Sequence, residues 1–219
     1  MKASIMPETE ERYISPCSGS GVLLWDMAGT LIPFDPVTGR AAALPGGEEF
    51  LPEMGKDFRL VVTTGDETRS ARNLLSGFGL LSNFEDVFGG LYTPLGKPYG
   101  RILRSINGKP QCSLAIGDRL RADLPADTDE VVTILINQNS EIINAGMVSF
   151  LISVLKKNGD SFPEAFHSLT KNADPAPELM GELQGGHVLS AWNCHTGFSF
   201  QMLKYQHPLL DGERLLIVI

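Results

Sequence analysis

Two aspartates that each follow a short apolar run are the feature of this sequence that most constrains its fold. Asp26 follows the apolar residues 22–25, and Asp118 follows the apolar run 113–116 and one glycine. Short apolar runs bounded by turn residues are consistent with strands that are buried inside a parallel sheet. Ligands of open α/β sheets bind at the carboxyl ends of the strands. We therefore expect the two carboxylates to lie at one edge and to share a divalent-metal site.

The order of the other segments predicts an α/β fold. Strand-like apolar runs alternate with amphipathic helix-like runs, which is the pattern of a parallel sheet with helices on both faces. We expect a three-layer, doubly wound, Rossmann-like core, an N-cap at Asp66, and a β-hairpin flap over residues 31–40. Strands are predicted at 22–25, 59–64, 84–88, 113–116 and 131–136, and helices at 45–54, 67–75, 101–106 and 141–157.

Composition divides the chain into three parts. Residues 1–20 are polar and include a Ser-Gly-Ser-Gly run, which predicts a flexible N-terminal segment. Residues 21–158 carry the alternating pattern of the α/β core. Residues 159–219 contain several prolines and then alternating aromatic residues. This pattern predicts a C-terminal appendage of loops, a short helix and a β-hairpin.

The charge balance excludes one class of partner. The net charge is −8 and the basic residues are scattered, so no nucleic-acid surface is expected. A phosphorylated small molecule or macromolecule remains compatible, because a bound Mg²⁺ reverses the local field. The N-terminal segment is acidic and no 18 apolar residues run together. Neither a signal peptide nor a transmembrane helix is therefore expected.

The cysteines predict a reducing compartment. There are three of them, Cys17, Cys112 and Cys194, without any short spacing between them. An odd, sparse set favours reduced thiols, and Cys112 is expected to be a core thiol at the start of a buried strand. Together with the absence of a signal peptide, this predicts a cytoplasmic protein.

Four short motifs resemble those of the haloacid dehalogenase superfamily, whose usual first and fourth motifs are DxDGT and GDxxxD. Asp26 matches the nucleophile of the first motif, and Thr64, or its neighbour Thr63, matches the hydroxyl of the second. Lys97, followed by a proline, matches the third-motif lysine. The fourth motif is Gly117-Asp118 with Asp123 five positions after Asp118. The resemblance covers roughly residues 20–140.

The resemblance implies a role for each of these residues. Asp26 would form an aspartyl-phosphate that water then hydrolyses, while Thr64 and Lys97 hold the phosphoryl oxygens. Substrate contacts would come from Thr30, Thr63 and Gly65. Mg²⁺, which prefers oxygen ligands, would be held by Asp26, Asp118 and the backbone oxygen of Ala28, with Asp123 orienting a metal-bound water or Lys97.

Ala28 departs from the family pattern, which has a second aspartate at this position. That aspartate acts as general acid and base, a contribution of about 10²–10⁴-fold. Three interpretations follow. The substrate has a leaving group that needs no acid, such as an acyl phosphate or an anhydride. Alternatively another residue, for example Asp66 or Asp35, supplies the proton, or catalysis is lost and a binding protein remains.

Two other members of the superfamily also lack the second aspartate. Phosphonoacetaldehyde hydrolase has alanine there, but it needs a lysine presented by a helical cap, and only Lys56 lies between the first two motifs. Dehalogenases likewise carry a cap. The 38 positions from Asp26 to Thr64 and the 33 from Thr64 to Lys97 are too few for one. The sequence therefore favours a capless enzyme and leaves phosphonate or haloacid hydrolysis as a further alternative.

The aromatic C-terminal appendage could cover such an open site or support oligomerisation. His187, Cys194 and His195 lack the tight spacing of a metal site, so they are interpreted as parts of a packed β-hairpin. The leading prediction is a Mg²⁺-dependent phosphohydrolase that lacks its general acid. A catalytically degenerate binding or interaction protein is the alternative.

Overall fold

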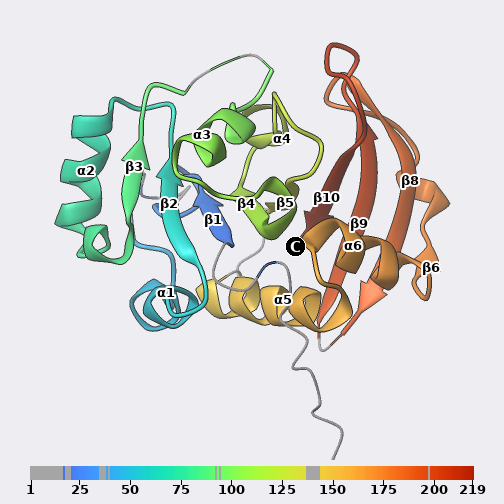
Figure 1. The fold of residues 1–219 in the computed structure, drawn as a ribbon, viewed down its shortest axis with the longest axis horizontal. Helices are drawn as coiled ribbons and strands as arrows, with labels where there is room; N and C mark the ends of the chain where they lie inside the picture. The colour runs from blue at the N-terminus through green and yellow to red at the C-terminus, as the bar shows by residue number, and fades with distance from the viewer. Residues whose placement is uncertain are drawn as a thin grey trace, which may run out of the picture.

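A computed structural model describes residues 17, 21–34, 38, 40–91, 93, 95–136, 144–196 and 198–219. One sheet runs through the molecule in the order β3-β2-β1-β4-β5-β10-β9-β8-β6, and β7 pairs with β8 (Figure 1). The strands are β1 Val22–Trp25, β2 Arg59–Thr63, β3 Asp86–Phe88, β4 Ser113–Gly117, β5 Val132–Leu135, β6 Asp174–Pro175, β7 Gly181–Leu183, β8 Gly186–His195, β9 Ser199–Gln206 and β10 Arg214–Val218. The helices are α1 Gly47–Met54, α2 Thr68–Gly77, α3 Tyr99–Ser105, α4 Leu120–Asp123, α5 Ala145–Asn158 and α6 Phe162–Thr170, with 3₁₀ turns η1 Leu81–Asn83, η2 Pro110–Cys112 and η3 Pro177–Leu179.

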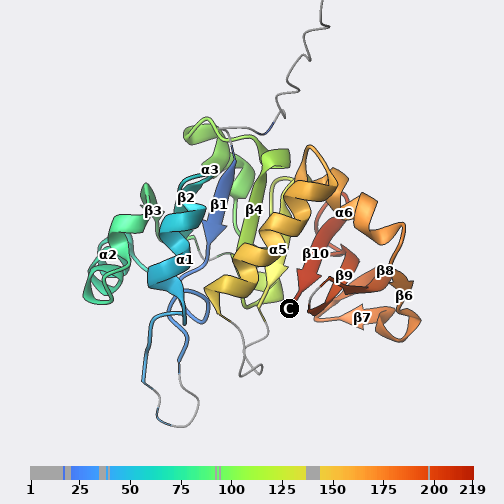
Figure 2. The same ribbon diagram turned by 90° about the horizontal axis from the view of Figure 1, so that it is seen from below.

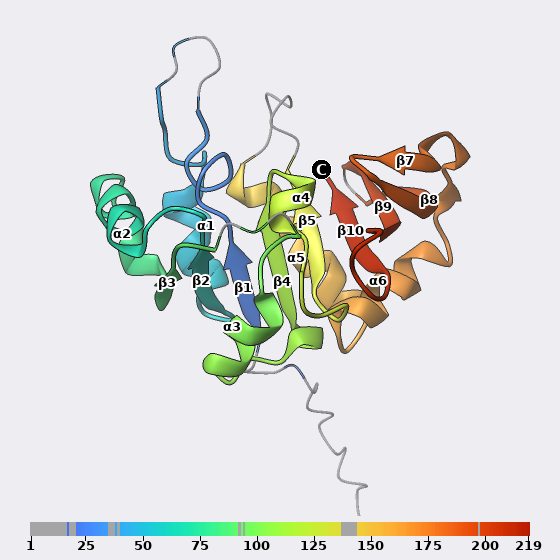
Figure 3. The ribbon, with the colours of Figure 1, turned by 90° about the horizontal axis from the view of Figure 1, so that it is seen from above.

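The first five strands form the predicted parallel sheet, with helices on both of its faces. Apolar side chains from α1, α2, α5 and α6 pack on one face, with Leu23, Trp25 and Ile116 among the buried strand residues beneath them (Figure 2). On the other face α3 covers Leu24 and Ala115, and α4 packs nearer to β10 (Figure 3). The predicted three-layer α/β class is therefore confirmed.

The C-terminal strands extend this sheet. Strand β10 pairs in parallel with β5 and antiparallel with β9, and β9 pairs antiparallel with β8. A strand-rich C-terminal region was predicted, and it is present. Its two faces are covered by α6 and by the segment around η3, and the buried Tyr205 packs on the second of these faces.

Two predicted details of helix starts are wrong, and in both cases tertiary contacts decide. Helix α2 begins at Thr68 with Glu67 as its N-cap, because the Asp66 carboxylate instead accepts a hydrogen bond from the Thr64 hydroxyl. Helix α3 begins at Tyr99, two residues before the predicted start. The carboxylate of Asp127, far along the chain, accepts hydrogen bonds from the first turn of α3 and satisfies its free N–H groups.

The predicted hairpin flap is present at its base. The backbone N–H of Ala42 donates to the Pro33 carbonyl, that of Leu44 donates to Leu31, and Phe34 forms an antiparallel bridge with Ala41. Part of its tip, including Asp35, lies outside the described residues.

The prediction of three reduced cysteines is wrong. Cys17 and Cys112 form a disulfide that ties the N-terminal segment to the start of β4, while Cys194 is a buried free thiol. Sparse spacing could not reveal this pair, because the two cysteines are 95 positions apart in sequence. Disulfides are rare in reducing compartments. The cytoplasmic location therefore stays a prediction, and this bond counts against it. In the part of the chain that is described, no helix combines the length and apolarity that crossing a bilayer requires.

Candidate functional site

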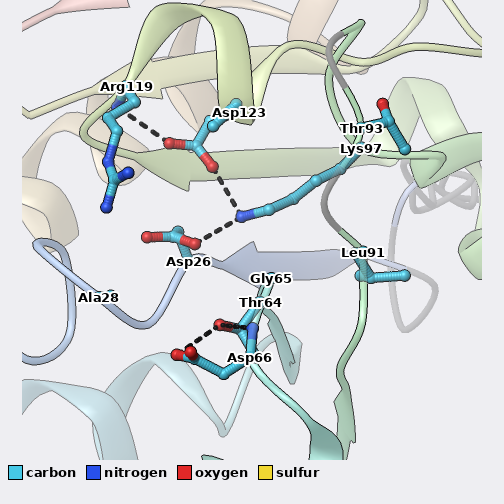
Figure 4. Close-up of a pocket in the computed structure, with 11 residues that line it drawn as sticks. Asp26, Ala28, Thr64, Gly65, Asp66, Leu91, Thr93, Lys97, Arg119 and Asp123 are labelled. Atoms are coloured by element: carbon cyan, nitrogen blue, oxygen red, sulfur yellow. Dashed lines mark hydrogen bonds and ion pairs between the residues drawn. The ribbon is translucent and has the colours of Figure 1, made fainter.

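The carboxyl ends of the three adjacent strands β2, β1 and β4 form the floor of the site. Strand β1 pairs in register with both neighbours, so Trp25 lies opposite Val62 on one side and Ile116 on the other. The residues that follow these strands therefore emerge at the same edge. They line a cavity of about 280 Å³ together with residues from two nearby loops (Figure 4). Its lining consists of Asp26, Ala28, Thr64, Gly65, Asp66, Leu91, Thr93, Lys97, Arg119, Ala122 and Asp123.

The Lys97 ammonium forms ion pairs with two carboxylates of this edge. Its Nζ atom lies 2.5 Å from an oxygen of Asp26 and 2.7 Å from an oxygen of Asp123, and it donates to the Thr63 carbonyl at 2.8 Å. All three N–H groups of the ammonium therefore have an acceptor. The side chain is almost completely buried. A lysine reaches this depth only when its charge is paired and hydrogen-bonded.

Asp118 and Asp123 are held by the loop that follows β4. The Asp123 carboxylate accepts hydrogen bonds from the backbone N–H groups of Asp118 and Arg119, at 3.1 and 3.0 Å. The Thr30 hydroxyl lies 3.2 Å from Asp118 and 3.4 Å from Asp26, so it orients both side chains. Gly117 is required because a Cβ atom there would lie 2.2 Å from the Asp123 carboxyl carbon.

Burial raises the pKa values of two carboxyl groups at this edge, Asp26 and Asp118. Burial raises the pKa of Asp26 to about 7, against the lowering effect of Lys97 and with further repulsion from Asp123. Burial and the negative charge of Asp123 also raise the pKa of Asp118. Burial alone would lower the pKa of Lys97, but the surrounding anionic groups, Asp123 and Asp26 among them, raise it above its usual value. The edge thus holds more negative charge than its lysine balances.

The donor set fits a hard divalent cation. Carboxylate oxygens of Asp26, Asp118 and Asp123 all lie within 4.8 Å of one another. Mg²⁺ prefers oxygen donors, and a cation here would reduce the repulsion between the carboxylates. Lys97 already occupies one oxygen of Asp26 and one of Asp123. Asp26 and Asp118, which share the Thr30 hydroxyl, are therefore the better candidates for direct ligands.

Cation binding is expected to weaken as the pH falls through 7. In the metal-free protein the raised pKa of Asp26 keeps a proton on this carboxyl up to about pH 7, and the cation must displace it. The apparent Kd for Mg²⁺ should rise about tenfold per pH unit below 7 and level off above it. Calorimetric titration between pH 5.5 and 8 in two buffers measures both the affinity and the released proton. Equal affinity at pH 5.5 and 7.5 would show that Asp26 carries no such proton.

The other predicted site residues lie at this edge in different ways. Thr64, Gly65 and Ala28 line the cavity. Thr30 and Thr63 are buried beneath it, and the Thr63 hydroxyl donates to the Trp25 carbonyl while its own carbonyl accepts from Lys97. Their backbone and side-chain contacts hold the Asp26 carboxylate, the end of β1 and the Lys97 ammonium. Their predicted roles as substrate contacts are not supported by such a position and remain predictions.

A tight turn places Ala28 at the cavity wall. The backbone N–H of Gly29 donates to the Ile32 carbonyl, and that of Ile32 donates to Met27. Gly29 has φ +87°, a left-handed conformation that glycine adopts without steric cost. Of the residues described, the carboxylates that line the cavity are Asp26, Asp66 and Asp123, and no glutamate or histidine joins them.

Several cavity residues were not identified from the sequence. Arg119 is the most informative, since it follows Asp118 directly and brings a positive charge to the cavity wall. Its neighbour Ala122, together with Leu91 and Thr93, completes the wall. Arg119 lies between Asp118 and Asp123, which match the fourth motif, but it is not itself part of the motif.

The C-terminal region does not form a wall of this cavity. No described residue of 187–219 lines it, so the expectation that the appendage covers the site is wrong. The region instead contacts the loop that holds the Lys97 backbone. The Arg214 guanidinium of β10 donates to the Pro125 carbonyl, and the adjacent loop residue Leu124 accepts from the backbone N–H of Lys97.

Comparison with known proteins identifies the fold. A family model described as haloacid dehalogenase-like hydrolase matches residues 44–126. No curated protein matches the chain. An uncharacterized protein from Listeria monocytogenes serotype 4b aligns with a TM-score of 0.51 and 15% identity, over 63% of this chain and 99% of that one. A haloacid dehalogenase-like family hydrolase from Xanthomonas campestris aligns with a TM-score of 0.51 and 11% identity, over 62% and 96% of the two chains.

These similarities confirm the resemblance found from the motifs. The family match, which begins after Asp26, includes Thr64, Lys97, Asp118 and Asp123 and supports a hydrolase of this type. The structural alignments show the fold alone, and no substrate follows from either comparison.

Proposed function

We propose that this haloacid dehalogenase-like hydrolase is a Mg²⁺-dependent phosphohydrolase that uses Asp26 as its nucleophile. The observation that carries the proposal is the buried Lys97, which contacts Asp26 and Asp123 at the carboxyl edge of the sheet. A structural ion pair needs one carboxylate. Here one ammonium contacts two members of a cluster of three carboxylates, Asp26 and Asp123, and both of these line a cavity. An arrangement of this kind suits the binding of a cation and a phosphoryl group.

The carboxylates would hold Mg²⁺, with Asp26 and Asp118 as direct ligands. Ala28 lines the cavity, and its backbone oxygen would be a third ligand, while Asp123 would stay bound to Lys97. When bound, the cation neutralises charge on the phosphoryl oxygens and allows the carboxylate and the phosphate to approach each other.

The residues of the chain would then act on the phosphoryl group in turn. A carboxylate oxygen of Asp26 attacks phosphorus, and Lys97 keeps that carboxylate oriented. Thr64, Gly65 and Asp66, which precede α2, line the same cavity, and the Thr64 hydroxyl would offer a donor to the phosphoryl oxygens. Water then cleaves the aspartyl-phosphate and regenerates Asp26.

The same site restricts what the enzyme accepts. With alanine at position 28, the turn beside the nucleophile offers no acid, so hydrolysis of simple esters should be slow. The partner we propose is a phosphorylated small molecule or the phosphorylated group of a macromolecule. We propose that the C-terminal strands support the loop of Pro125, and oligomerisation through them stays a prediction.

Trapping the phosphoryl site tests this function. Incubation with Mg²⁺ and beryllium fluoride should raise the melting temperature of the wild-type protein, because the fluoride complex bound to Asp26 imitates an aspartyl-phosphate. Asp26→Asn should show no such rise. Asp57→Asn is the matched control, since Asp57 is an exposed aspartate paired with Lys156, and it should behave as wild type. No rise in any protein, with Mg²⁺ itself failing to bind, would favour the binding protein over the enzyme.

A further inference from the structure

Among the described residues that line the cavity, no side chain is placed to give a proton to a leaving group. Asp123 accepts hydrogen bonds at both of its oxygens, from Lys97 and from two backbone N–H groups. Asp66 accepts from the Thr64 hydroxyl. Both carboxylates are therefore already engaged by hydrogen-bond donors. Lys97 directs its three N–H groups to Asp26, Asp123 and the Thr63 carbonyl, so none of them is left to face a leaving group.

Arg119 is the cationic group of the cavity wall that can turn toward a ligand. Its backbone N–H is fixed to Asp123, but its side chain is 65% exposed and its Nε atom lies 3.6 Å from Asp118. In Figure 4 the guanidinium projects on the same side of the Asp26 carboxylate as Ala28. A guanidinium does not release its proton near neutral pH, yet it binds carboxylates and phosphates through two parallel hydrogen bonds.

From these two observations we propose that the substrate is a phosphoric anhydride, a phosphoryl group joined through oxygen to a carboxylic or phosphoric acid, and that Arg119 binds the acid as it leaves. The inference rests on the proposed role of Asp26 as nucleophile. Alcohols must be protonated to leave easily, whereas carboxylate and phosphate are stable anions. The described wall carries the positive charge of Arg119 and no side chain placed to donate a proton, so it matches a carboxylate or phosphate leaving group.

The first step balances without a proton. One oxygen of the Asp26 carboxylate forms a bond to phosphorus, and the bond between phosphorus and the bridging oxygen breaks. The electron pair stays on that oxygen, and the acid departs as an anion beside Arg119. For an acyl phosphate, one acyl–phosphate bond replaces another, so the step is close to neutral in energy. Water then attacks phosphorus, Asp26 leaves as a carboxylate, and the proton of the water passes to phosphate or solvent.

Small compounds are enough to test the inference. The cavity volume of about 280 Å³ lies just below the usual range of ligand pockets, and a phosphoryl group and a cation would take part of it. Acetyl phosphate and pyrophosphate are therefore suitable test compounds, and they separate the carboxylic from the phosphoric source.

The test compares anhydrides with an alkyl ester that carries the same phosphoryl group. The values of kcat/KM for acetyl phosphate and pyrophosphate, each with Mg²⁺, are set against that for glycerol 3-phosphate. The kcat/KM of at least one anhydride should exceed that of the ester by about 10²-fold or more, because the ester needs the general acid that this site lacks. An ester hydrolysed within tenfold of both anhydrides would overturn the inference, because a proton donor would then be at work.

Arg119 variants test the second half of the inference. Arg119→Met should lower kcat/KM for the preferred anhydride roughly 10–100-fold. This loss is smaller than the usual loss on removing a buried oxyanion donor, because the Arg119 side chain is exposed. Arg119→Lys should restore part of it. Arg104→Met is the matched control, an exposed arginine outside the cavity wall that is 3.8 Å from Asp127, and it should act as wild type. Unchanged anhydride turnover in Arg119→Met would remove Arg119 from the proposal.

Failure of the inference is distinguishable from failure of the proposed function. If Asp26 is not a nucleophile, beryllium fluoride gives no Asp26-dependent stabilisation and none of the three compounds is hydrolysed. If only the substrate class is wrong, the stabilisation remains and the ester is hydrolysed as well as the anhydrides.

Discussion

Lys97→Met is expected to destabilise the metal-free protein by about 3–5 kcal/mol at pH 7.5, the usual effect of removing one partner of a buried ion pair. For a domain of this size that corresponds to a fall in melting temperature of about 6–20 °C. The reason is that Asp26 and Asp123 would face each other without the ammonium that now lies 2.5 and 2.7 Å from them. Methionine fills the volume of the lysine stem, so the loss reports charge and not a cavity.

The destabilisation should shrink in acid and in the presence of Mg²⁺. The pKa of Asp26 is already raised to about 7, and without Lys97 it rises further. A raised carboxyl pKa costs stability above the unfolded pKa, so protonating Asp26 as the pH falls toward 5 returns part of the loss. Mg²⁺ supplies positive charge to the same carboxylates. It should therefore raise the melting temperature of Lys97→Met more than that of the wild type.

Thermal melts at pH 5 and pH 7.5 test this expectation. At each pH the melting temperature is measured without Mg²⁺ and at Mg²⁺ concentrations that increase in 10-fold steps. Lys56→Met is the control, because Lys56 forms an exposed pair with Glu53 that should contribute less than about 1 kcal/mol. Turnover by Lys97→Met should be lost even where Mg²⁺ restores the fold, since nothing then orients Asp26. If Lys97→Met melts as the wild type does at pH 7.5, the carboxylates are not the interacting cluster that their geometry indicates.

The sequence predicted the α/β core well because its elements carry strong local patterns. The apolar runs at β1, β2 and β4 are short, are bounded by turn residues and end in Asp26, Thr64 and Asp118. A parallel sheet of adjacent strands leaves little choice about where these residues meet. Lys97 was assigned to the same site from its motif. Its burial and its three hydrogen-bond acceptors could not be predicted from a Lys-Pro pair.

What the sequence could not predict depends on contacts between distant segments. The disulfide of Cys17 with Cys112 and the capping of α3 by Asp127 each join residues far apart in the chain. The C-terminal strands gave an alternating pattern but no sign of which edge they would join. Pairing of β10 with β5 placed them beside the core and away from the cavity, where the sequence had suggested a cover.

Ala28→Asp is expected to raise the hydrolysis of simple phosphate esters by about 10²–10⁴-fold, the usual contribution of a general acid and base. In free energy of activation this is roughly 3–5 kcal/mol. Ala28 lines the cavity in a turn fixed by Gly29, which has φ +87°, so a longer side chain there points toward the same cavity as Asp26. The new carboxyl group could protonate a departing alkoxide and later accept a proton from the attacking water.

The gain should be selective for substrates that need a proton. Glycerol 3-phosphate should improve by most of the expected factor, while acetyl phosphate, whose leaving group departs as an anion, should improve far less in its first step. Steady-state kcat/KM for both compounds, at fixed Mg²⁺ and pH 7, measures the difference.

Ala122→Asp is the matched control, because it adds a carboxylate to another part of the same cavity wall and should not raise ester hydrolysis. An equal gain in both variants would mean that added negative charge, and not proton transfer at position 28, causes the effect. No gain in Ala28→Asp, where the wild type does hydrolyse acetyl phosphate, would mean that position 28 does not reach the leaving group, and that the absence of an acid there is not what restricts the substrate.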